Sequence, residues 1–290
     1  MALSITNLSK QYNAEKTAVS NFSLTINKGV LGLLGPNGAG KSTLMKMIAT
    51  ISKPSGGSLL LDGIDIVQNP NAIRKVLGYL PQDFGVYPNL NAYEFLEYIA
   101  AMKGVGGKGL RQRIDLLLEG VNLSADAKRP IGTYSGGMKQ RIGIAQALLN
   151  DPKVLIFDEP TVGLDPEERM RFRQLISDLA QDSIIILSSH IVSDIETIAD
   201  EVAIMKEGQL ITHAAQYDII QQAEGRIFEL LLDNSDLNTF KQQYRVIDTA
   251  RQADKIRVRY ISKAGTAAPS STQVTATLED AYLFLTQNNS

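Results

Sequence analysis

The sequence contains no cysteine and no tryptophan, and aromatic residues make up only 6% of its 290 positions. Without cysteine the chain has no disulfide, no zinc-thiolate site and no cysteine nucleophile. It also has no run near the roughly 18 consecutive apolar residues that a membrane-spanning helix needs. Its first residues lack the charged and then apolar layout of a signal peptide. We therefore expect a soluble, cytoplasmic protein.

Neither sign of charge dominates the chain. Its 29 Lys and Arg residues nearly balance 31 Asp and Glu residues, which leaves a formal net charge of -2. This balance gives no support to nucleic-acid binding through a basic surface, so no nucleic-acid partner is expected. The length allows one large domain, or a main domain with a smaller one, and 44% hydrophobic residues suffice for a sizeable core.

Short apolar runs alternate with helical patterns over most of the chain. Buried strands are predicted at 30–34, 154–157, 184–187 and 202–205, and helices at 167–180 and 193–199. After the first of these strands, one face of a helix is predicted from Leu44, Met47, Ile48 and Ile51. Two β-like stretches, at 3–8 and 21–26, open the chain. The pattern predicts an α/β domain with a mostly parallel sheet and N-terminal antiparallel strands.

Two regions depart from this alternation. Residues 83–150 carry helical patterns at 93–102, 110–118 and 138–149, which predict an inserted helical subdomain. The Gly- and Lys-rich stretch 103–109 follows no strand and has no Ser or Thr after its lysine, so we interpret it as a connector. Beyond residue 217, β-like stretches at 227–232 and 255–262, a polar stretch at 265–275 and a helix at 277–286 are predicted. We thus expect a domain at 1–217 and a small α+β appendage at 218–290.

Residues 35–43 read Gly-Pro-Asn-Gly-Ala-Gly-Lys-Ser-Thr and fit the pattern G-x-x-x-x-G-K-[ST]. Glycines let the backbone wrap closely around phosphates, so that successive N–H groups point at the anion. Lys41 is expected to reach the β- and γ-phosphates and the Ser42 hydroxyl to ligate Mg²⁺, while the following helix adds the positive end of its dipole. We call residues 35–43 the phosphate loop. They predict binding of a nucleotide with Mg²⁺, through Asn37, Gly38, Ala39, Gly40, Lys41, Ser42 and Thr43.

Three polar residues follow predicted buried strands. Asp158 and Glu159 come directly after the apolar run 154–157, and His190 follows the run 184–187 through two serines. Because the carboxyl ends of parallel strands meet at the ligand-binding edge of a sheet, these side chains are expected near the nucleotide. Asp158 suits the Mg²⁺ shell, Glu159 the polarisation of an attacking water, and His190 a contact with the γ-phosphate.

The segment 134–141, which reads Tyr-Ser-Gly-Gly-Met-Lys-Gln-Arg, makes the resemblance specific. It resembles the L-S-G-G-Q signature of the nucleotide-binding subunits of ABC transporters. Tyr134 replaces the Leu and Met138 replaces the Gln, whereas Ser135, Gly136 and Gly137 are retained. The resemblance implies that these three residues, with a hydroxyl and backbone amides at a helix N-terminus, face the γ-phosphate bound by a partner subunit.

Other elements resemble the same family in the same order along the chain. Tyr12 is similar to the aromatic residue that stacks on adenine, and Gln82 to the glutamine that touches Mg²⁺ and water. Asp165, in Gly-Leu-Asp-Pro, is similar to the loop residue that crosses to the opposite subunit. Read locally, Asp165 is also a helix N-cap with proline at the first helical position. The resemblance covers residues 1–217.

The resemblance implies an ATPase that works as a homodimer or with a paralogous subunit, beneath a transmembrane permease on the cytoplasmic face of the membrane. ATP and Mg²⁺ are the expected cofactors. Two other functions remain open: a soluble ABC protein acting on ribosomes or DNA, and a small-molecule kinase. Three features favour the transporter: the single phosphate loop, the short span between Lys41 and Asp158, and the slightly negative net charge. The ending 277–285 resembles that of drug and antibiotic exporters, so export is expected rather than import.

Overall fold

The computed structural model describes residues 1–13, 16–262 and 267–287. Two units make up the chain, Met1–Leu210 and Ile211–Ser290, and each is described by itself. Among the described residues, no helix is long and apolar enough to cross a membrane.

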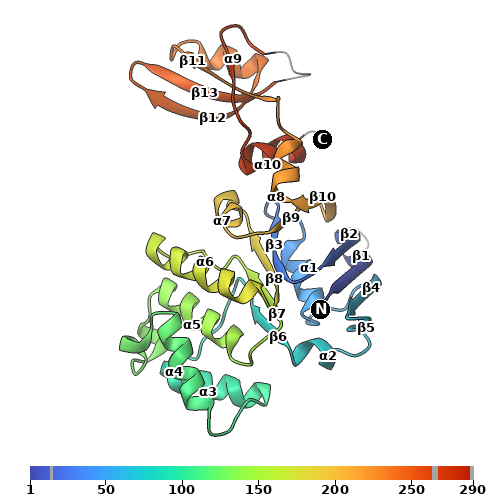
Figure 1. The fold of residues 1–290 in the computed structure, drawn as a ribbon, viewed down its shortest axis with the longest axis vertical. Helices are drawn as coiled ribbons and strands as arrows, with labels where there is room; N and C mark the ends of the chain where they lie inside the picture. The colour runs from blue at the N-terminus through green and yellow to red at the C-terminus, as the bar shows by residue number, and fades with distance from the viewer. Residues whose placement is uncertain (14–15, 263–266, 288–290) are drawn as a thin grey trace. The chain divides into compact units, whose positions relative to one another are not determined.

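A six-stranded sheet forms the centre of the first unit, in the order β10-β9-β3-β8-β7-β6 (Figure 1). Its strands are β3 (Gly29–Leu34), β6 (Leu77–Leu80), β7 (Val154–Asp158), β8 (Ile184–Ser189), β9 (Glu201–Lys206) and β10 (Gln209–Ala215), which continues past the end of the unit. The pairs from β9 to β6 are all parallel. Both faces of β7 and β8 are buried, which explains their continuous apolar runs. The predicted parallel sheet is confirmed.

A second, antiparallel sheet covers the helix that follows the phosphate-loop sequence. Its order is β2-β1-β4-β5, with β1 (Leu3–Asn13), β2 (Lys16–Ile26), β4 (Gly56–Leu61) and β5 (Ile64–Asp65). Helix α1 (Lys41–Ile48) lies between the two sheets, and its Leu44, Met45 and Ile48 are buried in the core shared by both (Figure 1). The loop before α1 is therefore held on both sides by strands.

The first helix is shorter than its apolar pattern suggested. Thr50 has a φ of 57°, a left-handed conformation that does not continue a helix. Ile51 lies beyond this turn and is 62% exposed, so its expected place on the buried helix face was wrong. The elements β4, β5, β6 and the short α2 (Asn71–Arg74) were not predicted.

Three helices occupy the region predicted to be helical and lie together on one side of the central sheet (Figure 1). They are α3 (Ala92–Lys103), α4 (Leu110–Gly120) and α5 (Gly136–Leu148), with two short 3₁₀ turns, Ser124–Asp126 and Ile131–Thr133, before α5. A capping box of Asn91 and Glu94 starts α3, and Gly104 ends it in a left-handed conformation. Ser135 is the N-cap of α5, so the signature sequence forms that helix's first turn.

Two helices connect the later strands of the central sheet. They are α6 (Pro166–Ala180) and α7 (Val192–Glu196). Asp165 caps α6 by accepting a hydrogen bond from the Glu168 N–H at 2.9 Å, and Pro166 is the first helical residue. The local interpretation of Asp165 and Pro166 as a helix start is thus confirmed.

In its described residues, the second unit has an antiparallel sheet and three helices. Its elements are α8 (Gln216–Gln221), β11 (Ile227–Leu232), α9 (Leu237–Gln243), β12 (Arg245–Gln252), β13 (Lys255–Ile261), β14 (Thr272–Gln273) and α10 (Leu278–Gln287), with strand order β12-β13-β11-β14. An aromatic cluster forms its core, from Phe228, Phe240, Tyr244 and Tyr260. The strands at 227–232 and 255–262 and the final helix match their predictions. Part of the polar stretch, 265–266, lies outside the described residues.

Candidate active site

The loop between β3 and α1 has the backbone of an anion cradle. Gly38 and Gly40 have φ values of 83° and 101°, which side chains other than glycine rarely adopt. A Cβ atom on Gly40 would lie 2.3 Å from the carbonyl oxygen of Ala18, and one on Gly35 would lie 2.5 Å from that of Met205. Close backbone packing therefore requires glycine at positions 35 and 40.

Lys41 is nearly enclosed by the loop that it follows. Its side chain is 6% exposed, and Nζ donates hydrogen bonds to the carbonyl oxygens of Gly35, at 2.6 Å, and Pro36, at 3.2 Å. Burial lowers the pKa of Lys41, and the nearby carboxylates of Glu159 and Asp158 oppose that shift. A phosphate would offer this ammonium a charged acceptor, and hydrogen bonds to charged groups are stronger than those to carbonyls.

One cavity of about 530 Å³ gathers most of the residues predicted to bind nucleotide. This volume suits a drug-sized or nucleotide-sized ligand. Its lining residues come from β1, β2, the phosphate loop, α1 and the ends of β6 and β7: Tyr12, Lys16, Thr17, Ala18, Asn37, Gly38, Ala39, Gly40, Lys41, Ser42, Thr43, Gln82 and Glu159. A loop of backbone N–H groups, a lysine and a hydroxyl fit a nucleotide triphosphate with Mg²⁺.

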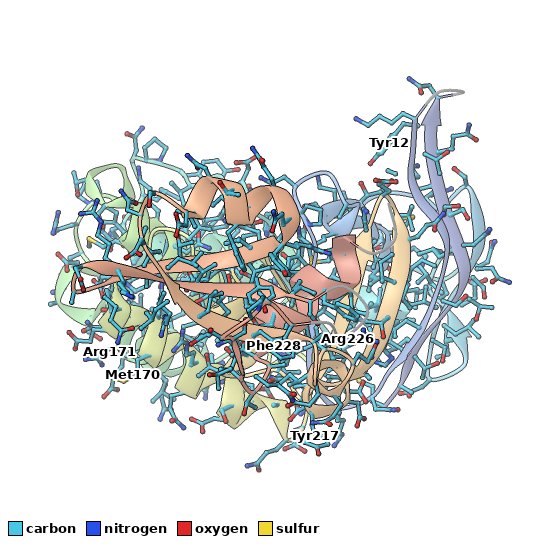
Figure 2. The ribbon with its side chains drawn as sticks, turned by 90° about the horizontal axis from the view of Figure 1, so that it is seen from above. Tyr12, Met170, Arg171, Tyr217, Arg226 and Phe228 are labelled. Atoms are coloured by element: carbon cyan, nitrogen blue, oxygen red, sulfur yellow. The ribbon has the colours of Figure 1, made fainter. Side chains whose placement is uncertain are left out.

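Tyr12 lies near the end of the long β1–β2 ribbon, away from the body of the central sheet (Figure 2). Tyr12 is 54% exposed, and the ammonium of Lys10 lies 5.3 Å from its ring centroid. An exposed ring at the rim of the cavity is available to stack on a base.

The two acids at the end of β7, Asp158 and Glu159, are held by one buried serine from the neighbouring strand. Asp158 pairs with Ser188 in the β7–β8 register. The Ser188 hydroxyl donates to Asp158 Oδ1 at 2.7 Å and accepts from the Glu159 N–H at 3.1 Å. Glu159 has a φ of 52°, unusual for a residue with a side chain, and lines the cavity. The strand thus ends in a sharp turn that directs one acid toward the phosphate loop.

His190, which follows β8, contacts Glu159. Its Nδ1 lies 3.0 Å from Glu159 Oε1, and its ring is 44% exposed while Glu159 is 9% exposed. After this residue the chain turns through a hydrogen bond from the Ile191 N–H to the Ser189 hydroxyl at 2.9 Å. An imidazole in this position can orient the carboxylate and still reach a ligand with its other nitrogen.

The signature residues Ser135, Gly136 and Gly137, together with Asp165, do not line this cavity. The cavity therefore brings together the phosphate loop, Gln82 and Glu159, with His190 in contact with Glu159, and leaves the signature outside. Tyr134, which replaces the family's Leu, is 4% exposed and donates its hydroxyl to the Asp126 carbonyl at 2.9 Å. The substitution keeps a buried anchor before the signature, with its polar end satisfied.

Sequence reasoning missed several residues of the site. From the sequence, Ser188 was only a residue between a predicted strand and His190, because its role depends on the β7–β8 register. Lys16, Thr17 and Ala18 line the cavity because β2 runs beside β1, which the nearby Tyr12 could have indicated. Tyr79 on β6 does not line the cavity, but burial and the Asp158 carboxylate raise its pKa to about 12.

These elements define a phosphate-loop nucleotide-binding fold with a helical insertion and a signature sequence at a helix start. The family model described as ABC transporter matches residues 19–162. The uncharacterized ABC transporter ATP-binding protein YxlF of Bacillus subtilis is 38% identical over 79% of this chain and 76% of its own length. The chain therefore belongs to the ATP-binding subunits of ABC transporters.

Other similar proteins have more specific names. The probable multidrug ABC transporter ATP-binding protein YbhF of Escherichia coli is 39% identical over 78% of this chain, which spans 39% of that protein's length. The bacitracin transport ATP-binding protein BcrA of Enterococcus faecalis is 34% identical over 89% of this chain and 84% of its own. Among solved structures, the dimeric bacterial ABC transporter cassette MJ0796 has a TM-score of 0.67 at 25% identity, covering 73% of this chain and 98% of that one.

Proposed function

We propose that this chain hydrolyses ATP to power export through a separate membrane-spanning permease, on the cytoplasmic face of the membrane. The observation that carries the proposal is the cavity in which the phosphate loop, Lys41, Gln82 and Glu159 meet. A nucleotide-binding protein needs only the first two, whereas a carboxylate turned into the phosphate end of the cavity supplies a base for hydrolysis.

Mg²⁺ would be held by the Ser42 hydroxyl, the Asp158 carboxylate and Gln82. In proteins Mg²⁺ commonly uses one or two carboxylates with substrate phosphates and water, so this small donor set fits the ion. When bound, the ion neutralises charge on the phosphates. The hydrogen bond from Ser188 holds the Asp158 carboxylate in one orientation before any ion arrives.

Hydrolysis needs a base, an orienting group and charge stabilisation near the terminal phosphate. In this proposal Glu159 accepts a proton from the attacking water, and His190 orients that carboxylate through its 3.0 Å contact. Lys41 would exchange its bonds to the Gly35 and Pro36 carbonyls for phosphate oxygens. Each of these roles uses a side chain that a strand end or the helix start already holds in place.

A second subunit would complete each ATP site. Ser135, Gly136, Gly137 and Asp165 lie outside the cavity of their own chain, as residues that serve a partner's nucleotide should. The similar MJ0796 cassette is a dimer in its solved structure. We propose a homodimer or a pair with a paralogous subunit, bound to a transmembrane permease. The relatives named for multidrug and bacitracin transport support export.

Replacement of the proposed base tests the function. Glu159→Gln should retain ATP binding, lower the hydrolysis rate about 10²–10⁴-fold and trap an ATP-bound dimer that size-exclusion chromatography detects. Glu167→Gln is the control, because Glu167 is exposed on α6 and bonds only Arg171 among the contacts described for its side chain. Normal turnover by Glu159→Gln would remove that residue from its proposed role.

Purification from native membranes tests the partner. The chain should copurify with a multispanning membrane protein. Sedimentation with ribosomes instead would refute the transporter proposal.

A further inference from the structure

The first turns of α5 lie directly against the segment 160–164, which follows the proposed base. Gln140 Nε2 donates a hydrogen bond to the carbonyl oxygen of Pro160 at 3.0 Å, and Pro160 is buried. A Cβ atom on Gly137 would lie 2.9 Å from the carbonyl oxygen of Gly163. The two segments therefore meet backbone to backbone, with one side-chain amide fixing them in register.

A second contact joins the start of α5 to the first turn of α6. Arg141 Nη1 lies 3.2 Å from Glu168 Oε1, and both side chains are mostly buried, at 15% and 11% exposure. Glu168 belongs to the first turn of α6, which Asp165 caps. The start of α5 and residues 160–168 thus form one packed junction. Displacement of either segment must strain or break these bonds.

The chemistry at the two ends of this junction differs. Pro160 follows Glu159, whose backbone already has an unusual positive φ of 52°, so a shift of Pro160 reorients that acid. Gln140 lies on the helix that starts with Ser135 and the two glycines. In the dimer of the proposed function, Glu159 acts on the ATP of its own subunit, whereas Ser135 serves the ATP of the other.

We infer that Gln140 is a positioning residue that couples the two ATP sites. Its amide bond to the Pro160 carbonyl transmits a shift at the start of α5, caused by the partner's nucleotide, to the turn that carries Glu159. Occupancy of one site then prepares the base of the other. This inference rests on the proposed function, since it needs hydrolysis in a dimer.

The test removes the donor and keeps the side chain's length. Gln140→Met in the full chain should lower the Hill coefficient of ATP hydrolysis from above unity toward unity. Its kcat should fall by no more than about fivefold, the equivalent of one neutral hydrogen bond. The half-saturating ATP concentration of the first site should not change, because Gln140 does not line the nucleotide cavity.

Gln146→Met is the matched control on the same helix. Gln146 Nε2 donates to the Tyr79 carbonyl at 2.8 Å, so this variant also loses an amide-to-carbonyl bond, but one directed at β6. It should lower the denaturation midpoint at least as much as Gln140→Met and keep the wild-type Hill coefficient. A structural role alone for Gln140 would change the midpoint and leave the coefficient unaltered.

Two failures can be told apart. If the wild-type chain hydrolyses ATP cooperatively, Glu159→Gln forms the trapped dimer, and Gln140→Met keeps the wild-type coefficient, the inference is wrong and the proposed function stands. If the wild-type chain shows no hydrolysis or no cooperativity, there is no coupling for Gln140 to transmit. The inference is then wrong as well.

Discussion

Ser188 offers the sharpest test of how the carboxylate site is built. Its buried hydroxyl both donates to Asp158 and accepts from the Glu159 N–H. Ser188→Ala removes a bond to a charged acceptor, which contributes about 1.5–3 kcal/mol, and leaves a buried N–H unpaired, at about 1–3 kcal/mol. The Ser188 hydroxyl takes part in both hydrogen bonds, so one substitution removes them together. We therefore expect a decrease of about 3–5 kcal/mol in the free energy of unfolding.

This decrease should be measurable without ATP. For a domain of about 150–250 residues, each kcal/mol lowers the melting temperature by about 2–4 °C, so a fall of about 6–20 °C is expected by circular dichroism. The hydrolysis rate should fall about ten- to a hundredfold, since Glu159 loses the anchor of its backbone. ATP binding should weaken less, because Ser188 does not line the cavity.

Ser183→Ala is the matched control for a buried serine on the same part of the chain. Ser183 is 3% exposed and makes one long bond, 3.3 Å, to the Pro152 carbonyl. Its removal should cost about 0.5–1 kcal/mol and leave the hydrolysis rate unchanged. If Ser188→Ala is no more destabilising than Ser183→Ala and hydrolyses ATP at the wild-type rate, the paired hydrogen bonds of Ser188 do not organise the site.

Three further changes test other parts of the chain. Gly40→Ala places a Cβ atom 2.3 Å from the Ala18 carbonyl oxygen. The resulting strain of about 1–3 kcal/mol should lower the ATP affinity measured by calorimetry. An unchanged affinity would contradict the loop geometry. Desolvation lowers the pKa of Lys103 to about 8. Above about pH 8, Lys103 therefore binds a proton less often in the folded chain than in the unfolded chain. Between that pH and the ordinary lysine pKa, the free energy of unfolding, measured in denaturation experiments, should rise relative to that of Lys103→Met. Arg259→Met strands two carboxylates that Arg259 holds at 2.7 and 3.0 Å; it should destabilise the second unit by about 3–5 kcal/mol while calorimetric ATP binding persists.

Much of the fold could be predicted because its core strands carry local signals. β7 and β8 are buried on both faces, so their sequences are uninterrupted apolar runs, and their predicted starts match the structure. The phosphate loop is also local: its glycines, lysine and hydroxyl act within nine consecutive residues, 35–43. Spacing alone is enough to place such groups on one loop and one helix start.

The elements and residues that the sequence did not predict depend on partners far along the chain. β6 has four residues and becomes a strand only because it pairs with β7. Ser188 is important because the β7–β8 register sets it opposite Asp158, thirty residues away. Ile51 has an apolar side chain, yet the left-handed turn at Thr50 carries it off the helix and into solvent. Tertiary pairing decides these features, and no periodicity encodes it.

The arrangement of polar groups explains why the signature and the base are expected to work on different nucleotides. Lys41 and Glu159 line one cavity. Ser135 is exposed, and its hydroxyl is used to cap its own helix, accepting from the Met138 N–H at 3.2 Å. Such a helix start keeps free N–H groups for an anion supplied from outside the chain. Since Gln140 on that helix bonds the residue next to Glu159, a nucleotide bound at the exposed end would act on the chain's own base through a single rigid junction.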